Sequence, residues 1–66
     1  MEYVENKVST LRKEKDVTQE EFADKIGVSR QTVVAIEKGN YTPSLLLGLK
    51  IANYFGKKVD EVFKLK

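Results

Sequence analysis

Apolar residues recur every three or four positions along most of this chain, a spacing that predicts helices. We expect five helices, over residues 6–15, 19–26, 30–38, 45–55 and 60–63. The two ends differ, because residues 2–4 and 63–66 alternate between polar and apolar side chains as strands do. The ends can therefore pair as a tiny antiparallel ribbon, and fraying of both termini is an equally good interpretation.

The expected second helix has a well-marked start and end. Thr18 stands at the N-cap position and Glu21 follows three residues later, so the two can form a capping box. Val17 and Phe22 occupy the positions of a hydrophobic staple around this start. Gly27 ends the helix, because glycine readily adopts the left-handed conformation of a C-terminal cap.

The expected third helix begins after Ser29, a good N-cap residue, and ends at Gly39-Asn40. Its inner side carries Val33 and Ile36. Its outer side is formed by Arg30, Gln31, Val34, Ala35 and Lys38. Small Ala23 at the crossing of the two helices and a glycine in the turn favour a helix-turn-helix. Any other corner between two well-capped helices is the structural alternative.

The fourth expected helix starts after Ser44 and stops at Gly56. Its apolar residues form two stripes along the helix. One stripe consists of Leu45, Leu49, Ala52 and Phe55, and the other of Leu47, Ile51 and Tyr54. Gly48 lies inside this helix, where glycine costs about 1 kcal/mol relative to alanine.

Composition narrows the classes of function. Sixty-six residues make one domain with a small core. The chain contains neither Cys nor His, which removes disulfides, thiolate metal sites and the commonest general base. We therefore expect no enzyme activity, no metal and no cofactor. No long apolar run and no signal-peptide pattern are present, so we expect a cytoplasmic protein outside the membrane.

Charge distribution says more than the net charge of +2. Between residues 29 and 58 there are five cationic residues and a single acidic one, Glu37. Most acidic residues come before this region. A basic region on a nearly neutral molecule is compatible with a nucleic-acid partner, and ordinary scatter of surface charge is the alternative.

Residues 18–38 resemble the helix-turn-helix of the Cro and phage-repressor type, the Xre family. The resemblance extends over roughly residues 6–63 and is most specific in the runs 28–33 and 36–39. Further matching residues are Leu11-Arg12, Tyr41, Pro43-Ser44-Leu45, Ile51-Ala52 and Asp60 to Phe63. It implies an all-α, compact five-helix lambda-repressor-like DNA-binding domain spanning residues 1–66. Double-stranded DNA is the implied partner, and no small-molecule effector is evident.

The resemblance implies that the third helix is a recognition helix. Arg30 and Gln31 stand at its start, the part that meets base edges. Arginine pairs with guanine and glutamine with adenine, while Val34 and Ala35 can contact thymine methyl groups. The expected phosphate contacts are Gln19, Thr32, Lys38, Asn40 and Tyr41. For each of these residues the alternative is a solvated surface position or, for Val34, packing against the domain.

The resemblance also implies an ion pair between Arg12 and Glu37 that ties the first helix to the third, with two exposed charges as the alternative. Specific binders of this type use two-fold dimers. The candidates for a dimer interface are Leu46, Leu47, Tyr54, Val62, Phe63 and Leu65. These residues can instead complete the core.

We therefore expect a transcriptional regulator that binds a near-palindromic operator as a homodimer and represses. The alternative is a protein-interaction module, such as the antitoxin or anti-repressor partner of another protein.

Overall fold

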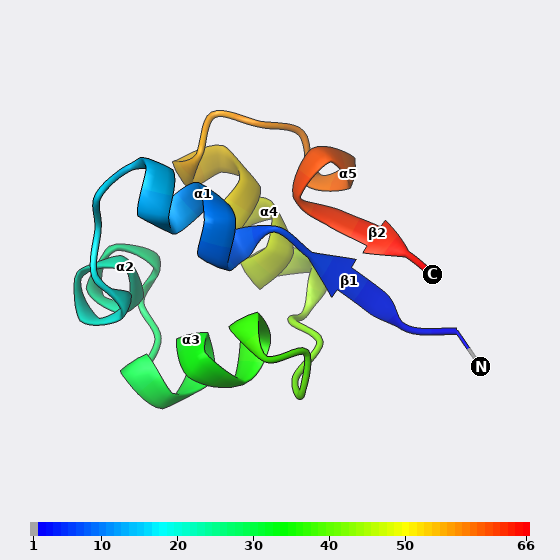
Figure 1. The fold of residues 1–66 in the computed structure, drawn as a ribbon, viewed down its shortest axis with the longest axis horizontal. Helices are drawn as coiled ribbons and strands as arrows, with labels where there is room; N and C mark the ends of the chain where they lie inside the picture. The colour runs from blue at the N-terminus through cyan, green and yellow to red at the C-terminus, as the bar shows by residue number, and fades with distance from the viewer. Residues whose placement is uncertain (1) are drawn as a thin grey trace.

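Five helices and a two-stranded ribbon make up residues 2–66, the part of the chain that this computed structural model describes. In chain order they are β1 (Val4–Asn6), α1 (Val8–Glu14), α2 (Gln19–Ile26), α3 (Arg30–Glu37), α4 (Leu45–Tyr54), α5 (Val59–Val62) and β2 (Phe63–Leu65). Figure 1 shows α3 along one edge of the molecule and the ribbon at the end where both termini lie. The expected five-helix fold is confirmed.

Helices α2, α3 and α4 begin where their cap residues predict. The Oγ1 atom of Thr18 accepts the N–H of Glu21 at 3.1 Å, and a Glu21 carboxylate oxygen accepts the N–H of Thr18 at 2.9 Å. This is the predicted capping box. Ser29 and Ser44 each accept the N–H three residues on, at 3.1 and 3.2 Å. Gly27 ends α2 with φ of +77°, a conformation that glycine adopts without strain.

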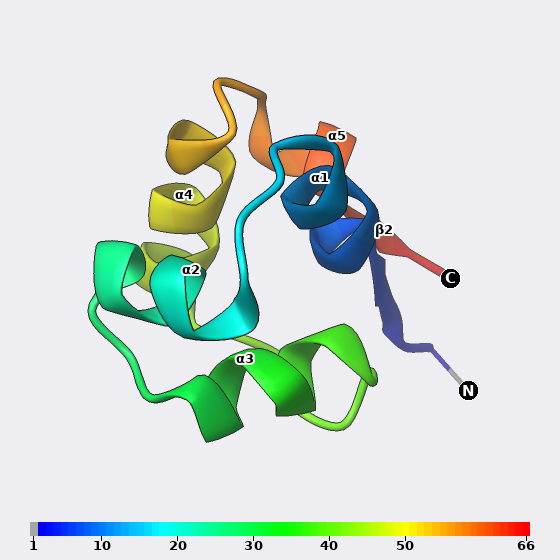
Figure 2. The same ribbon diagram turned by 60° about the vertical axis from the view of Figure 1, so that its left-hand side comes forward.

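One apolar core lies between the helices. Helix α2 packs against α3 and α4, α1 packs against α3, and α5 packs against α4 (Figure 2). Ala23 is almost fully buried, as expected of a small residue between two packed helices. The largest fully buried side chains are Val8, Phe22, Val33, Ile36, Ile51 and Val62. The core therefore draws on every helix, and it holds α3 from behind.

The two ends of the chain pair rather than fray. Strands β1 and β2 run antiparallel, with Val4 opposite Leu65 and Asn6 opposite Phe63. Tyr3 and Lys66 continue the ladder through reciprocal backbone hydrogen bonds of 3.0 and 2.8 Å. The ribbon closes the fold on the side of α1 and α5.

The ribbon also moves two helix boundaries from their predicted places. Asn6 belongs to β1, and its side-chain oxygen accepts the N–H of Val8 at 3.0 Å, so α1 begins at Val8 instead of residue 6. Phe63 belongs to β2, so α5 ends at Val62. In both cases backbone pairing between the strands takes residues that helical spacing alone had assigned to a helix.

Helix α4 buries only part of its apolar surface. Leu47, Ile51 and Ala52 face the core. Leu45 and Leu49, from the first of the two apolar stripes, lie outside the core, because their side chains are 74% and 48% exposed. The described part of the chain offers no element to cover that side of the helix.

Candidate nucleic-acid interface

Helix α3 presents two different sides. Val33 and Ile36 are fully buried and anchor the helix in the core. Arg30 and Gln31, in its first turn, are exposed. Val34 and Ala35 are half-buried, between the two sides. A helix held in this way offers polar side chains at its N-terminal end to a partner, while its inner side fixes its position.

The predicted phosphate contacts lie at both ends of α3. Gln19 begins α2 and is half-buried, and Thr32 is half-buried in α3 with its hydroxyl oxygen 3.0 Å from that of Ser29. Lys38, Asn40 and Tyr41 follow the other end of α3 and are exposed. The structure thus brings Gln19 close to the first turn of α3. Lys38, Asn40 and Tyr41 lie instead where the chain leaves α3 toward α4.

Arg12 and Glu37 form an ion pair that joins α1 to the last residue of α3. Arg12 Nε lies 2.7 Å from Glu37 Oε2, and the two side chains are only 11% and 7% exposed. Arg12 Nη2 donates to Glu37 Oε1 at 3.2 Å, and Nη1 donates to the carbonyl of Val17 at 2.9 Å. The hydrogen bond with Glu37 raises the pKa of Arg12. The structure brings together the two charges that the sequence suggested.

The ion pair continues toward the start of α3. Gln19 Nε2 donates to Glu37 Oε1 at 3.1 Å. Arg30 Nη2 in turn donates to Gln19 Oε1 at 3.4 Å. Four side chains from α1, α2 and α3 therefore form one hydrogen-bonded chain that ends at an exposed arginine. The ion pair of Arg12 with Glu37 was expected, but the contacts of Gln19 with Glu37 and Arg30 were not, since nothing in the spacing shows which side chains meet across helices.

The side chain of Asn6 makes further hydrogen bonds at the end of α3, which were not predicted. Asn6 Nδ2 donates to the carbonyl of Ile36 at 2.8 Å, while its Oδ1 accepts the N–H of Val8. One side chain thus binds both the last turn of α3 and the first turn of α1. Asparagine two residues before the first buried position of a helix is a capping signal, which could have identified the contact with Val8 but not that with Ile36.

The order and geometry of these helices match a known family. A profile described as helix-turn-helix matches residues 8–62. This chain belongs to that helix-turn-helix family. Helices α2 and α3 are the two helices of the motif, and α3 is its second helix.

Curated relatives are similar over nearly the whole chain. An HTH-type transcriptional regulator of Methanocaldococcus jannaschii is 52% identical over 60 residues, which cover 91% of each chain. One from Bacillus subtilis is 51% identical over 63 residues, 96% of each chain. The cryptic phage CTXphi transcriptional repressor of Vibrio cholerae is 40% identical over 57 residues, which are 86% of this chain and 51% of that protein. These matches support a transcriptional regulator with a helix-turn-helix DNA-binding domain.

Two solved structures share the fold of this chain. The clp gene regulator ClgR of Corynebacterium glutamicum superimposes with a TM-score of 0.75 at 26% identity, over 82% of this chain and 57% of that one. A putative DNA-binding protein of Bacteroides fragilis gives 0.81 at 22% identity, over 97% of this chain and all of that one. The second match shows the fold alone.

The side chains considered for a dimer interface are placed very differently in this helix-turn-helix domain. Leu46 and Leu65 are 71% and 68% exposed. Tyr54 and Phe63 are half-buried. Leu47 and Val62 belong to the core, so their assignment to a free surface is corrected. Both face inward because α4 and α5 pack against each other and α4 also packs against α2.

No group of three or more acidic, His or Cys side chains is placed to hold a metal ion within residues 2–66. None of the helices in this part of the chain has the length and apolar character needed to span a bilayer.

Proposed function

We propose that this protein is a dimeric repressor that reads a near-palindromic operator with α3 in the major groove. The observation that carries the proposal is the division of α3 into a buried side at Val33 and Ile36 and an exposed first turn at Arg30 and Gln31. Recognition helices of helix-turn-helix proteins contact base edges with their N-terminal residues. The protein would act in the cytoplasm, on the DNA held there.

Base recognition would rest on four side chains of α3. The guanidinium of Arg30 suits the O6 and N7 acceptors of guanine, and the amide of Gln31 suits adenine. Val34 and Ala35 are half-buried and offer methyl groups to thymine. The hydrogen bond of Gln19 with Arg30 limits the positions that the guanidinium can adopt before DNA binds.

Phosphate contacts would fix the register of α3 on the duplex. Gln19 stands at the N-terminus of α2, where free N–H groups and the helix dipole favour an anion. Thr32, Lys38, Asn40 and Tyr41 are the further candidates, on α3 and on the loop after it. Because these positions lie at both ends of α3, they would contact the backbone on both sides of the groove that α3 enters.

Two copies are needed to read a two-fold symmetric operator. Successive half-sites on one side of the duplex are about 34 Å apart. The longest dimension of this domain is 32 Å, so two copies have room to lie side by side on such half-sites. A dimer bound in this way covers the operator and would repress by blocking polymerase.

Selection from random duplex oligonucleotides tests the proposal. We expect an inverted repeat whose two halves are centred about one helical turn apart. The affinity for the selected duplex should fall steeply with salt, in a linear log–log plot, as phosphate contacts release counterions. Failure to enrich any duplex, or enrichment of an asymmetric single site bound by one copy, would contradict it.

A further inference from the structure

Helix α3 ends in a tight turn with a fixed pattern of hydrogen bonds. The N–H of Gly39 donates to the carbonyl of Ile36 at 3.0 Å, and the N–H of Asn40 donates to the carbonyl of Ala35 at 2.9 Å. Gly39 has φ of +79°. This is a Schellman motif, in which a glycine in the left-handed conformation ends the helix. The turn therefore sets the direction in which the chain leaves α3.

Asn6 binds this turn from outside the helix. Its Nδ2 donates to the carbonyl of Ile36 at 2.8 Å, so this carbonyl accepts both the amide of Asn6 and the N–H of Gly39. A carbonyl oxygen has two lone pairs, so both hydrogen bonds can form at once. Asn6 thereby clamps α3 at the same atom that closes the turn.

Asn6 is itself held in one orientation. Its Oδ1 accepts the N–H of Val8 at 3.0 Å, so a flip of the amide would lose the hydrogen bonds of both its ends. Its backbone lies in β1, opposite Phe63 of β2. The N–H of Lys7, the next residue, donates to the carbonyl of Val62 at 2.9 Å. The paired ends of the chain therefore fix the side chain that holds the end of α3.

Residues 38–42, which form and follow the turn, have little packing to fix them. All of them are exposed. Strand β1 runs beside the start of this segment, and residues of both line the groove between them (Figure 2). Three of the proposed phosphate contacts, Lys38, Asn40 and Tyr41, belong to this segment. Because burial does little to place them, their position relative to α3 depends on the hydrogen bonds of the turn.

We propose that Asn6 is a positioning residue for DNA binding, a proposal that rests on the repressor function and the phosphate contacts proposed above. Asn6 acts without touching the duplex. It holds the turn, so that Lys38 and Asn40 stay where they can contact the DNA backbone when α3 enters the groove. A segment that is already ordered loses less conformational entropy when DNA binds. The paired ends of the chain thereby contribute to DNA affinity from outside the two helices of the motif.

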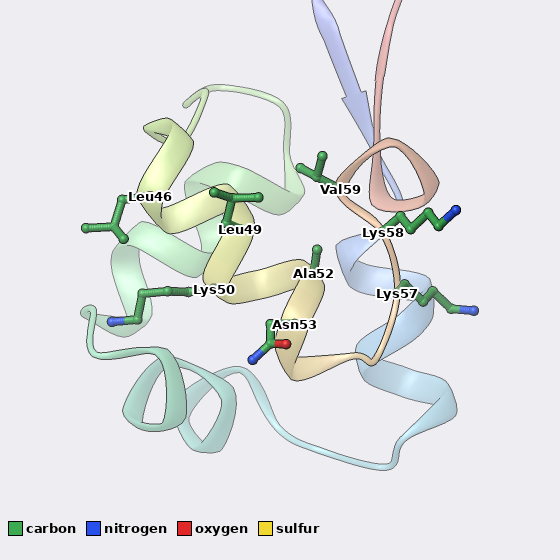
Figure 3. Close-up of a pocket in the computed structure, with 8 residues that line it drawn as sticks. All are labelled: Leu46, Leu49, Lys50, Ala52, Asn53, Lys57, Lys58 and Val59. Carbon is green, nitrogen blue, oxygen red and sulfur yellow. The ribbon is translucent and has the colours of Figure 1, made fainter.

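The variant Asn6→Ser tests the proposal. Serine can still accept the N–H of Val8, as capping residues do, but its shorter side chain does not reach the carbonyl of Ile36. The substitution leaves the net charge unchanged, so it adds no repulsion of DNA. Asn53→Ser is the matched control, because Asn53 is exposed in the last turn of α4 and lines the groove between α4 and α5 (Figure 3).

Duplex titrations at a temperature where circular dichroism shows every variant folded measure the effect. We expect Asn6→Ser to bind the selected operator and unrelated duplexes about tenfold more weakly, with unchanged base preference, because phosphate contacts carry no sequence information. The salt slope should fall by up to about 1, as for Lys38→Ala, and Asn6→Ser/Lys38→Ala should lower it no further. Asn53→Ser should bind like the parent.

Amide hydrogen exchange gives a second readout, without DNA. In Asn6→Ser the amides of Gly39 and Asn40 should exchange at least about tenfold faster than in the parent, because the turn opens more often. The amide of Gly27, which makes the corresponding bond at the end of α2, should keep its rate.

Two outcomes would overturn the proposal directly. One is an Asn6→Ser variant with a lower Tm but the affinity of the parent, which would make Asn6 merely stabilising. The other is a double variant whose salt slope falls by the sum of the two single losses, since Asn6 would then act independently of Lys38.

Failure of the proposed function gives different results. A parent chain that binds no duplex refutes the repressor function and this proposal with it. If Lys38→Ala binds every duplex like the parent, the proposed phosphate contact of Lys38 is wrong. Asn6 then remains a positioning residue only if Asn6→Ser still weakens binding and speeds exchange at Gly39 and Asn40.

Discussion

The side-chain amide of Gln19 donates a hydrogen bond to the carboxylate of Glu37, 3.1 Å away and 18 residues later in the chain. The same carboxylate binds Arg12, and the same amide group accepts from Arg30. A buried ion pair between α1 and α3 is thereby connected to the exposed arginine that we propose reads DNA. One hydrogen-bonded chain thus contains both the buried ion pair and the proposed base-reading side chain.

Removing Arg12 should destabilise the fold severely. In Arg12→Met the Glu37 carboxylate, 7% exposed, loses its charged partner, and the free energy of unfolding should fall by about 3–5 kcal/mol. Urea unfolding followed by circular dichroism measures this. The double variant Arg12→Met/Glu37→Leu removes the buried charge and should recover most of the loss. A double variant as unstable as the single one would show that the ion pair has another role.

Gln31→Ala should affect base choice more than folding. Gln31 is exposed, so the free energy of unfolding should change little. Affinity for the selected operator should fall by about 1–3 kcal/mol, with relaxed preference at one position of each half-site. Titration of the operator and of duplexes changed at single positions measures both effects.

Lys38→Ala is the matched control for that experiment. Lys38 is a proposed phosphate contact, so its loss should weaken binding to all duplexes alike and lower the salt slope by about 1. If Gln31→Ala behaved like Lys38→Ala, with uniform weakening and unchanged base preference, the assignment of Gln31 to base reading would be wrong.

Gly48→Ala should stabilise the domain. A β-carbon at this position in α4 would meet side-chain atoms of Phe63 and Val59 at 3.9 Å, an ordinary van der Waals distance. The gain in helix propensity is about 1 kcal/mol, measurable as a higher Tm. Gly56→Ala is the control, because Gly56 has φ of +66° and alanine there should lower the Tm. A lower Tm for Gly48→Ala would mean that the packing against Phe63 is tighter than these contacts indicate.

Acid should weaken the fold through two capping carboxylates. Hydrogen bonds from Thr18 lower the pKa of Glu21 below its ordinary 4.5, and the N–H of Lys58 does the same for Glu61. Because the pKa is lower in the folded state, the stabilising contribution is present above about pH 4.5 and is lost as the pH falls through the folded value.

Urea midpoints measured from about pH 6 down to about pH 3 follow this loss. The urea midpoint of Glu21→Gln/Glu61→Gln should fall less with decreasing pH than that of the parent. The urea midpoint of Glu20→Gln/Asp60→Asn, which also removes one carboxylate from the first turn of α2 and one from that of α5, should decline like that of the parent. Equal declines in all three proteins would contradict a role for the capping carboxylates.

The sequence predicts the parts of this fold that depend on local signals. Thr18, Ser29 and Ser44 mark three helix starts, and Gly27 marks the turn, because capping and positive φ are properties of a few neighbouring residues. The division of α3 into two sides follows from the spacing of Val33 and Ile36. These local features are sufficient to predict the exposed polar first turn of α3, where we propose the recognition surface.

Contacts between distant segments were harder to predict. Helix α4 is apolar on several sides, so spacing alone could not show that Leu45 and Leu49 would lack a covering neighbour. Whether the termini would pair depended on how close the fold brings them. The clamp by Asn6 on Ile36 spans 30 residues and leaves no periodic signal in the chain.

Methylation interference at guanine N7 tests most directly whether α3 lies in the major groove, since this atom is exposed there. On the selected operator, we expect methylation of at least one guanine in each half-site to block binding of the parent chain. In Arg30→Ala this interference should disappear at the same guanine while other positions keep theirs. An identical interference pattern for the parent and Arg30→Ala, or none within the half-sites, would contradict the reading of bases by α3.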